Sequence, residues 1–137
     1  MPKIPDYING VQVIAPSTAN LDVDSGLIKA LKQCITSSIS NYVLESIYIS
    51  SAHDSHKYPS RHMQGKGKAV DISRINGLRM SVYYTQDSKV AAITNAIQTR
   101  FESYPGRREN FGPFFKKKFG DDYVISEHGD HIHLSIN

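Results

Sequence analysis

The 137-residue sequence predicts one α+β domain, spanning residues 1–137, with a small antiparallel sheet and helices packed on one side of it. Two stretches, 25–44 and 88–104, repeat apolar residues at helical spacing. Short runs rich in β-branched and aromatic residues lie between these stretches and after them. The predicted order is therefore helix, strand, strand, helix and a terminal hairpin.

The first part of the chain predicts an extended segment followed by a helix. Residues 1–21 contain three prolines and are expected to be extended. The helix over 25–44 can be capped by Asp24 or Ser25. Its apolar face consists of Leu27, Leu31, Cys34, Ile35, Ile39 and Tyr42. Cys34 is the only cysteine, so we expect a buried small hydrophobe, with no internal disulfide and no thiolate zinc cluster.

The middle of the chain predicts two strands and the second helix. Residues 45–51 and 68–73 read as strands, joined by loop or hairpin residues at 58–67. The helix over 88–104 begins after a cap at Asp87 or Ser88. Its apolar face, which we expect to pack in the core, consists of Val90, Ile93, Ile97, Phe101 and Tyr104.

The last part of the chain predicts an irregular segment and a hairpin. Residues 105–122 are irregular, basic and aromatic. Within them, 106–120 could form an ordinary packed loop, a lid, a cell-wall contact, a partner surface or a contact with single-stranded nucleic acid. Residues 123–137 read as strand, turn and strand, with Gly129 and Asp130 in the turn.

Charge and hydropathy narrow the classes of partner. The net charge of +3 suits an anionic partner, but a dedicated nucleic-acid binder would show a denser basic face. No apolar run is long enough for a transmembrane helix. The first residues lack a basic region followed by an apolar stretch, so we expect no cleavable signal peptide and synthesis in a host cytoplasm.

All six histidines fall in two short windows, each of which also contains carboxylates. The windows hold His53, His56 and His62 with Asp54 and Asp71, and then His128, His131 and His133 with Glu127 and Asp130. Two such windows can meet in a folded chain and form a mononuclear zinc site without cysteine. Surface histidines on an edge strand remain the alternative for the second window.

Strand periodicity indicates which of these side chains share a face. In the terminal strand, His131 and His133 point to one side, while Ile132 and Leu134 point to the core. In the strand over 68–73, Asp71 points away from the branched residues on either side of it. His62 precedes Asp71 by nine residues, an odd separation, so a hairpin can place both on one face.

Two imidazoles and one carboxylate around zinc leave a fourth position for water, whose pKa the metal lowers to about 7. A nearby carboxylate can take the proton of this water and pass it to a leaving amine. Asp130 and Glu127 are the candidates for this base, although Asp130 could instead only shape the turn.

The pattern Ser60-x-His62, a glycine, Ala69-x-Asp71 and a terminal His131-x-His133 resembles the zinc D-Ala-D-Ala-type peptidases of the M15 family. This group includes D-alanyl-D-alanine carboxypeptidases and phage L-alanyl-D-glutamate endolysins, with an M15/hedgehog-like fold. The resemblance covers residues 47–73 and 123–136. Eight residues separate His62 from Asp71 where the family usually has six, so Gly-Lys-Gly-Lys is a two-residue expansion.

The resemblance implies a role for each matching residue. It implies Zn²⁺ bound by His62, Asp71 and His133, with Asp130 as the catalytic carboxylate and His131 as a transition-state or supporting partner. Ser60 and Arg61 lie where family members position substrate. The expansion leaves His56 as an alternative ligand, and His131 could ligate instead of His133, with Glu127 or His128 then acting as base. We expect His53 and His56 to be exposed loop residues.

The resemblance implies an enzyme that cuts a peptidoglycan stem peptide at a bond involving a D-amino acid, and we expect it to be a monomer. The small size and the missing signal pattern suit a phage-encoded enzyme acting at the bacterial cell wall. Two alternatives remain at this stage. One is a virion-associated or binding module of the same fold without catalysis, and the other is a small basic nucleic-acid-binding protein.

Overall fold

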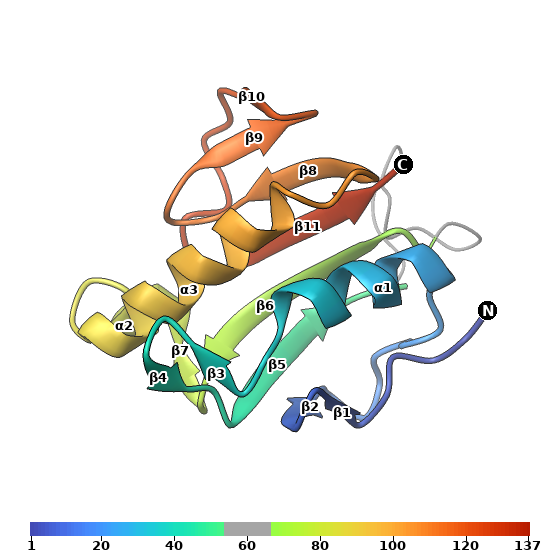
Figure 1. Cartoon of the computed structure of the whole chain (residues 1–137), viewed down its shortest axis with the longest axis horizontal. Coiled ribbons are helices and arrows are strands. Elements are labelled where there is room, and N and C mark those ends of the chain that lie inside the picture. The colour runs from blue at the N-terminus through green and yellow to red at the C-terminus, as the bar shows by residue number, and fades with distance from the viewer. Residues whose placement is uncertain (54–66) are drawn as a thin grey trace.

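A computed structural model describes residues 1–53 and 67–137, and shows a mixed α/β chain with a mostly antiparallel sheet (Figure 1). In spatial order the main sheet contains β1 (Tyr7–Ile8), β2 (Val11–Ile14), β5 (Ser46–Ser51), β6 (Ala69–Ile75), β11 (Ile132–Ile136), β8 (Arg107–Phe111), β9 (Lys116–Lys118) and β10 (Asp121–Asp122). A short strand, β7 (Leu78–Arg79), pairs with β6. Among the described strand pairs, only β2 and β5 run parallel.

Two helices begin where the sequence predicts. In α1 (Ser25–Cys34) the Asp24 carboxylate accepts the Gly26 N–H at 2.8 Å, and in α3 (Ser88–Phe101) Asp87 accepts from Lys89 and Val90. These bonds satisfy amides that have no partner within the helix. A further short helix, α2 (Met80–Tyr83), follows β7.

The predicted helix over 25–44 is too long, because α1 ends at Cys34. The chain then forms a separate hairpin of β3 (Ser38–Ile39) and β4 (Tyr42–Val43). Its two turn residues, Ser40 and Asn41, both adopt positive φ, which is the geometry of a tight hairpin turn. Ile39 is buried, as predicted, but it belongs to this hairpin and not to a helix. Cys34 is also buried, and burial raises the pKa of its thiol to about 12.

Both long helices cover the same face of the sheet, as predicted (Figure 1). Val70 and Ile72 of β6, together with Ile132 and Leu134 of β11, lie in the core with α1 and α3. Because side chains alternate along a strand, their neighbours Asp71 and His133 face the opposite side of the sheet. The core thus fixes which side of the sheet presents the polar residues.

The expected extended lead-in is a hairpin at the edge of the sheet. Asn9 and Gly10 form the turn between β1 and β2 with φ of 49° and 81°. The Asn9 side chain donates to the carbonyls of Lys32 and Ile35 at 2.8 and 2.9 Å. These two bonds satisfy carbonyls at the end of α1 and tie the edge hairpin to the helix layer.

The segment over 105–122, which we expected to be irregular, instead forms β8, β9 and β10. The sequence of these strands lacks a regular apolar pattern, because the buried residue Asn110 of β8 is polar. Asn110 hydrogen-bonds to Gln98 of α3 instead of packing against an apolar neighbour. Of the phenylalanines, Phe111 is buried whereas Phe114 and Phe119 are about half exposed. The cations of this segment are partly neutralised by ion pairs: Arg107–Glu102, Lys117–Asp122 and Lys118–Glu109.

The predicted first strand of the terminal hairpin is also wrong. Residues 123–131 form no strand, and β11 lies between β6 and β8, so that both of its edges are already paired. A hairpin partner would have no free edge to join. His128 adopts a positive φ of 71° in this connection and packs against Phe111.

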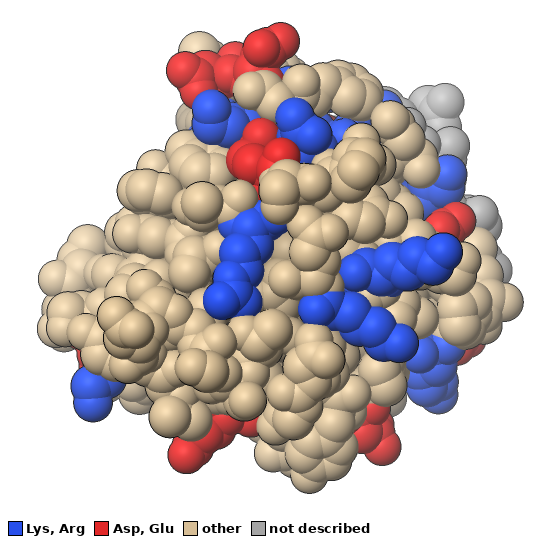
Figure 2. Space-filling model, viewed as in Figure 1, with Lys and Arg blue, Asp and Glu red and all other residues tan. Residues whose placement is uncertain are grey.

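The helix-covered face presents separated Lys and Arg side chains with uncharged surface between them (Figure 2). Within the part of the chain that the structure describes, no helix has the length and apolar character that crossing a membrane requires.

Gly112→Ala tests the polar contact that positions β8. A Cβ at Gly112 would overlap the Gln98 side-chain amide, which bonds Asn110, the Phe115 carbonyl and the Phe114 N–H. We expect the free energy of unfolding, measured by urea denaturation, to fall by about 1–3 kcal/mol. Gly129→Ala is the matched control, because a Cβ there meets nothing within 4 Å. Equal stability of the two variants would contradict this role of Gln98.

Candidate active site

The sheet face opposite the helices holds a line of polar side chains from three adjacent strands. Asp71 of β6 and His133 of β11 are direct cross-strand partners, and their Oδ1 and Nδ1 atoms lie 2.8 Å apart. On the other side of the ring, His133 Nε2 lies 3.0 Å from Glu109 Oε1 of β8. Ser135 donates its hydroxyl to the same Glu109 oxygen at 2.9 Å and accepts the Glu109 N–H at 3.1 Å. The His133 ring is therefore held between two carboxylates.

The two carboxylates strongly favour the charged form of His133. Burial alone would lower the pKa of this imidazole, but the hydrogen bonds and charges of Asp71 and Glu109 outweigh burial and raise it to about 9. Burial likewise opposes ionisation of Glu109, yet His133, Ser135 and Arg108 lower the pKa of its carboxyl to about 2. In the metal-free protein at neutral pH, the group is a negative–positive–negative triad.

His131 and Asp130 lie beside this triad. The His131 Nδ1 atom lies 2.6 Å from Asp130 Oδ1, and its Nε2 atom lies 3.8 Å from Asp71 Oδ1. The hydrogen bond from His131 lowers the pKa of the Asp130 carboxyl. Both histidines of the predicted pair thus approach Asp71, although only His133 is part of β11.

The other predicted base candidates, His128 and Glu127, differ from Asp130 in their surroundings. The His128 ring centroid is 5.0 Å from that of His131 and 5.2 Å from that of His133. Burial, followed by the charges of those two imidazoles, lowers the pKa of His128, which favours its neutral form. Glu127 is exposed to solvent. Asp130, which is hydrogen-bonded to His131 beside Asp71, is placed best for proton transfer next to the triad.

The first histidine window is described only in part. His53 is buried, and its Nδ1–H donates to the Asp22 carbonyl at 2.8 Å, so the expectation of an exposed loop residue is wrong for His53. A backbone carbonyl from the segment before α1 holds this ring in place. The other predicted residues of this window lie outside the described residues: His56, Ser60, Arg61 and His62.

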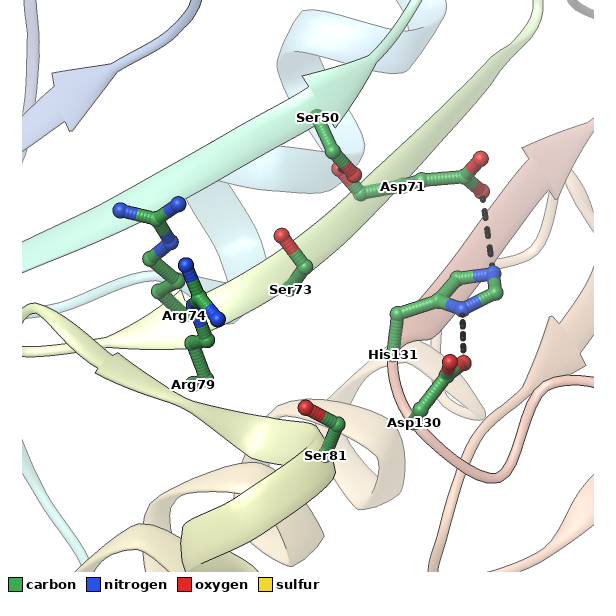
Figure 3. A pocket seen from close by; sticks show the side chains of 8 residues that line it. All are labelled: Ser50, Asp71, Ser73, Arg74, Arg79, Ser81, Asp130 and His131. Atoms are coloured by element: carbon green, nitrogen blue, oxygen red, sulfur yellow. Dashed lines mark hydrogen bonds and ion pairs between the residues drawn. The ribbon is translucent and has the colours of Figure 1, made fainter.

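A pocket of about 280 Å³ adjoins the triad on the same face of the sheet (Figure 3). Its lining consists of Ser50, Asp71, Ser73, Arg74, Arg79, Ser81, Asp130 and His131. In Figure 3 the two arginines lie at one end, whereas Asp130 and His131 lie at the other end. The lining residues are therefore all of polar or charged types, and opposite charges lie at opposite ends of the pocket.

Two β-bulges between β5 and β6 shape this pocket. Tyr48 pairs with Arg74 and Ile49 with Ile72, so Ser73 is an extra residue in β6. Ser51 then pairs with Asp71, so Ser50 is an extra residue in β5. Bulges reverse the simple alternation of side chains. Ser73 and Arg74 can consequently both line the pocket, although they are adjacent in sequence.

The donor set around Asp71 suits zinc at two of the three predicted ligand positions. A carboxylate oxygen and an imidazole Nδ1 face each other, and Glu109 engages the remaining ring nitrogen, as carboxylates do behind zinc-ligating histidines. No group of three or more metal-binding side chains is found within residues 1–53 and 67–137. The third predicted ligand, His62, lies outside those residues.

Several site residues are missed by sequence analysis. Glu109 and Ser135 have no motif, although a correct strand prediction for β8 would have placed Glu109 and Phe111 on one face. Arg74 is missed because the bulge at Ser73 breaks the period-two pattern.

Searches against protein-family models, curated proteins and solved structures returned no match for this chain.

The pKa of His133 makes the stability of the metal-free protein depend on pH. The folded-state pKa is raised from 6.5 to about 9, so this stabilisation is complete below pH 6.5 and is lost as pH rises through 9. We expect the free energy of unfolding in chelator to fall by up to about 3 kcal/mol across that window. Glu109→Gln should flatten the decline, whereas Glu45→Gln, at an exposed position, should not. A wild-type profile that is flat from pH 6.5 to 9 would contradict the charged triad.

Proposed function

We propose that this chain is a zinc-dependent peptidase of the M15 type that hydrolyses a peptidoglycan bond involving a D-amino acid at the bacterial cell wall. The observation that most supports the proposal is the meeting of Asp71 Oδ1 and His133 Nδ1 at 2.8 Å across two strands, at the edge of a polar pocket. These are two of the three ligands that the sequence motif implies.

Asp71, His133 and His62 are the proposed zinc ligands. Bound zinc supplies an activated water and polarises the substrate carbonyl. Glu109 accepts the Nε2–H of His133, and so fixes the tautomer that leaves Nδ1 free for the metal. Ser135 in turn holds Glu109 in place.

Asp130 is the proposed general base and acid. Its lowered pKa keeps it ionised at neutral pH, ready to accept a proton from the attacking water and to pass it to the leaving amine. His131 donates Nδ1–H to this carboxylate at 2.6 Å and thereby orients it. When His131 is doubly protonated, it carries a second N–H at Nε2, on the side toward Asp71, and this N–H can stabilise negative charge that develops on the substrate oxygen. Ser60 and Arg61 remain proposed substrate-positioning residues.

Digestion of purified peptidoglycan tests the proposed reaction directly. The zinc-loaded protein should release new amino and carboxyl termini, and mass analysis of the fragments identifies the bond. Addition of chelator should abolish release, and zinc should restore it. Zinc binding without hydrolysis would support a non-catalytic module, whereas absence of zinc together with salt-dependent nucleic-acid binding would support a nucleic-acid-binding protein.

Substitutions should separate ligands from the base. Asp71→Ala, His133→Ala and His62→Ala should lose zinc, measured as metal per chain after dialysis. Asp130→Ala should keep zinc but lose about 10²–10⁴-fold in kcat, because only proton transfer is removed. Asp122→Ala is the control, since that exposed carboxylate lies on β10, outside the site. Full activity of Asp130→Ala would transfer the base role to Glu127 or His128.

A further inference from the structure

Two arginines at one end of the pocket have an unusual arrangement. Arg74 of β6 and Arg79 of β7 are direct cross-strand partners. Like charges at such positions destabilise a strand pair. No ion pair within the described parts of the chain gives either guanidinium a carboxylate partner. An anion bound between them would relieve this repulsion.

Arg74 is held ready for such an anion. Its guanidinium carbon lies 4.2 Å from the ring centroid of Tyr48, its cross-strand partner on β5. This cation–π contact and the bulge at Ser73 restrict the side chain to the pocket side of the sheet. A planar guanidinium that is already oriented loses less entropy when it binds a carboxylate.

The opposite end of the pocket holds the acid–base residues, so the two ends differ in character. There the carboxylates of Asp71 and Asp130 are engaged by imidazoles at 2.8 and 2.6 Å. Ser50 and Ser73 lie between the ends and offer hydroxyl groups (Figure 3). The volume of about 280 Å³ is at the small end for a ligand pocket, which suits a single small residue.

We propose that Arg74 and Arg79 bind a substrate carboxylate on the residue that follows the cleaved bond. This inference rests on the proposed peptidase function, because it takes Asp130 as the donor to the leaving amine. Asp130 lines the same pocket as the arginines. The residue that bears the leaving amine therefore occupies this pocket, with its carboxylate toward the two guanidinium groups.

Two cell-wall bonds place a carboxylate at that position. A carboxypeptidase substrate has the terminal carboxylate of the released D-alanine. An endopeptidase substrate cut before a γ-linked D-glutamate has the free α-carboxylate of that glutamate. Both present the same group to the arginines, so a carboxylate site in this pocket suits either bond, and the carboxylate itself fixes neither the chirality of the residue nor which of the two bonds is cut.

Binding is tested first, because it does not require hydrolysis. The probes are N-acetyl-D-alanine and L-alanyl-D-glutamine, each compared with its α-amide, N-acetyl-D-alaninamide and L-alanyl-D-glutaminamide. NMR titration of zinc-loaded protein should show carboxylate binding that is at least about 10-fold tighter than amide binding. Arg79→Ala and Arg74→Gln should remove this preference, whereas Lys89→Ala, an equal charge loss at an exposed position of α3, should retain it.

Cleavage assays then identify the source of the carboxylate. Hydrolysis of an acyl-D-alanyl-D-alanine peptide, or of an L-alanyl-D-glutamine peptide, assigns the bond, and in either case the arginine variants should raise KM for the carboxylate form only. Carboxylate preference that persists in both arginine variants, or no carboxylate binding at all, overturns the inference. Arginine-dependent binding without cleavage of either peptide contradicts the proposed peptidase and leaves the carboxylate site in place.

Discussion

The pairing of β11 between β6 and β8 is the constraint on which the rest of the site depends. Its register sets His133 opposite Asp71 on one side, and Glu109 reaches the same ring from the other side. A shift of one residue would turn His133 toward the helices and bring an apolar neighbour into the site. The buried face of β11, through Ile132 and Leu134, opposes that shift. Core packing thereby fixes the positions of the polar residues.

The pocket depends on a second feature of the sheet, the two bulges between β5 and β6. The bulges in β5 and β6 leave Asp71 in register with β11 while they direct Arg74 toward the pocket. The acid–base residues and the arginines therefore share one cavity but stand at opposite ends of it (Figure 3). One small substrate residue can therefore reach from the reacting bond to the two arginines. This distance is the basis of the proposed substrate preference.

Apolar repeats predict the α+β class, capping residues predict both helix starts, and strand alternation predicts that His133 and Asp71 face away from the core. It fails where tertiary contacts override the pattern. Glu109 is missed because β8 is polar and gains its stability from Asn110 and its neighbours in the sheet. Arg74 is missed because a bulge changes its face. The terminal hairpin is wrong because β11 already has partners on both edges.

The ¹⁵N signals of the His133 ring during zinc titration test most directly whether the β11 register places His133 as a metal ligand. We expect the Nδ1 signal to move to the shift of a metal-bound nitrogen while Nε2 stays protonated, because Glu109 accepts its proton. Asp71→Asn should weaken that response, whereas the ring signals of His53, held by the Asp22 carbonyl, should not change. Unchanged signals of the His133 ring, or metal binding through Nε2, would contradict zinc ligation by His133 Nδ1.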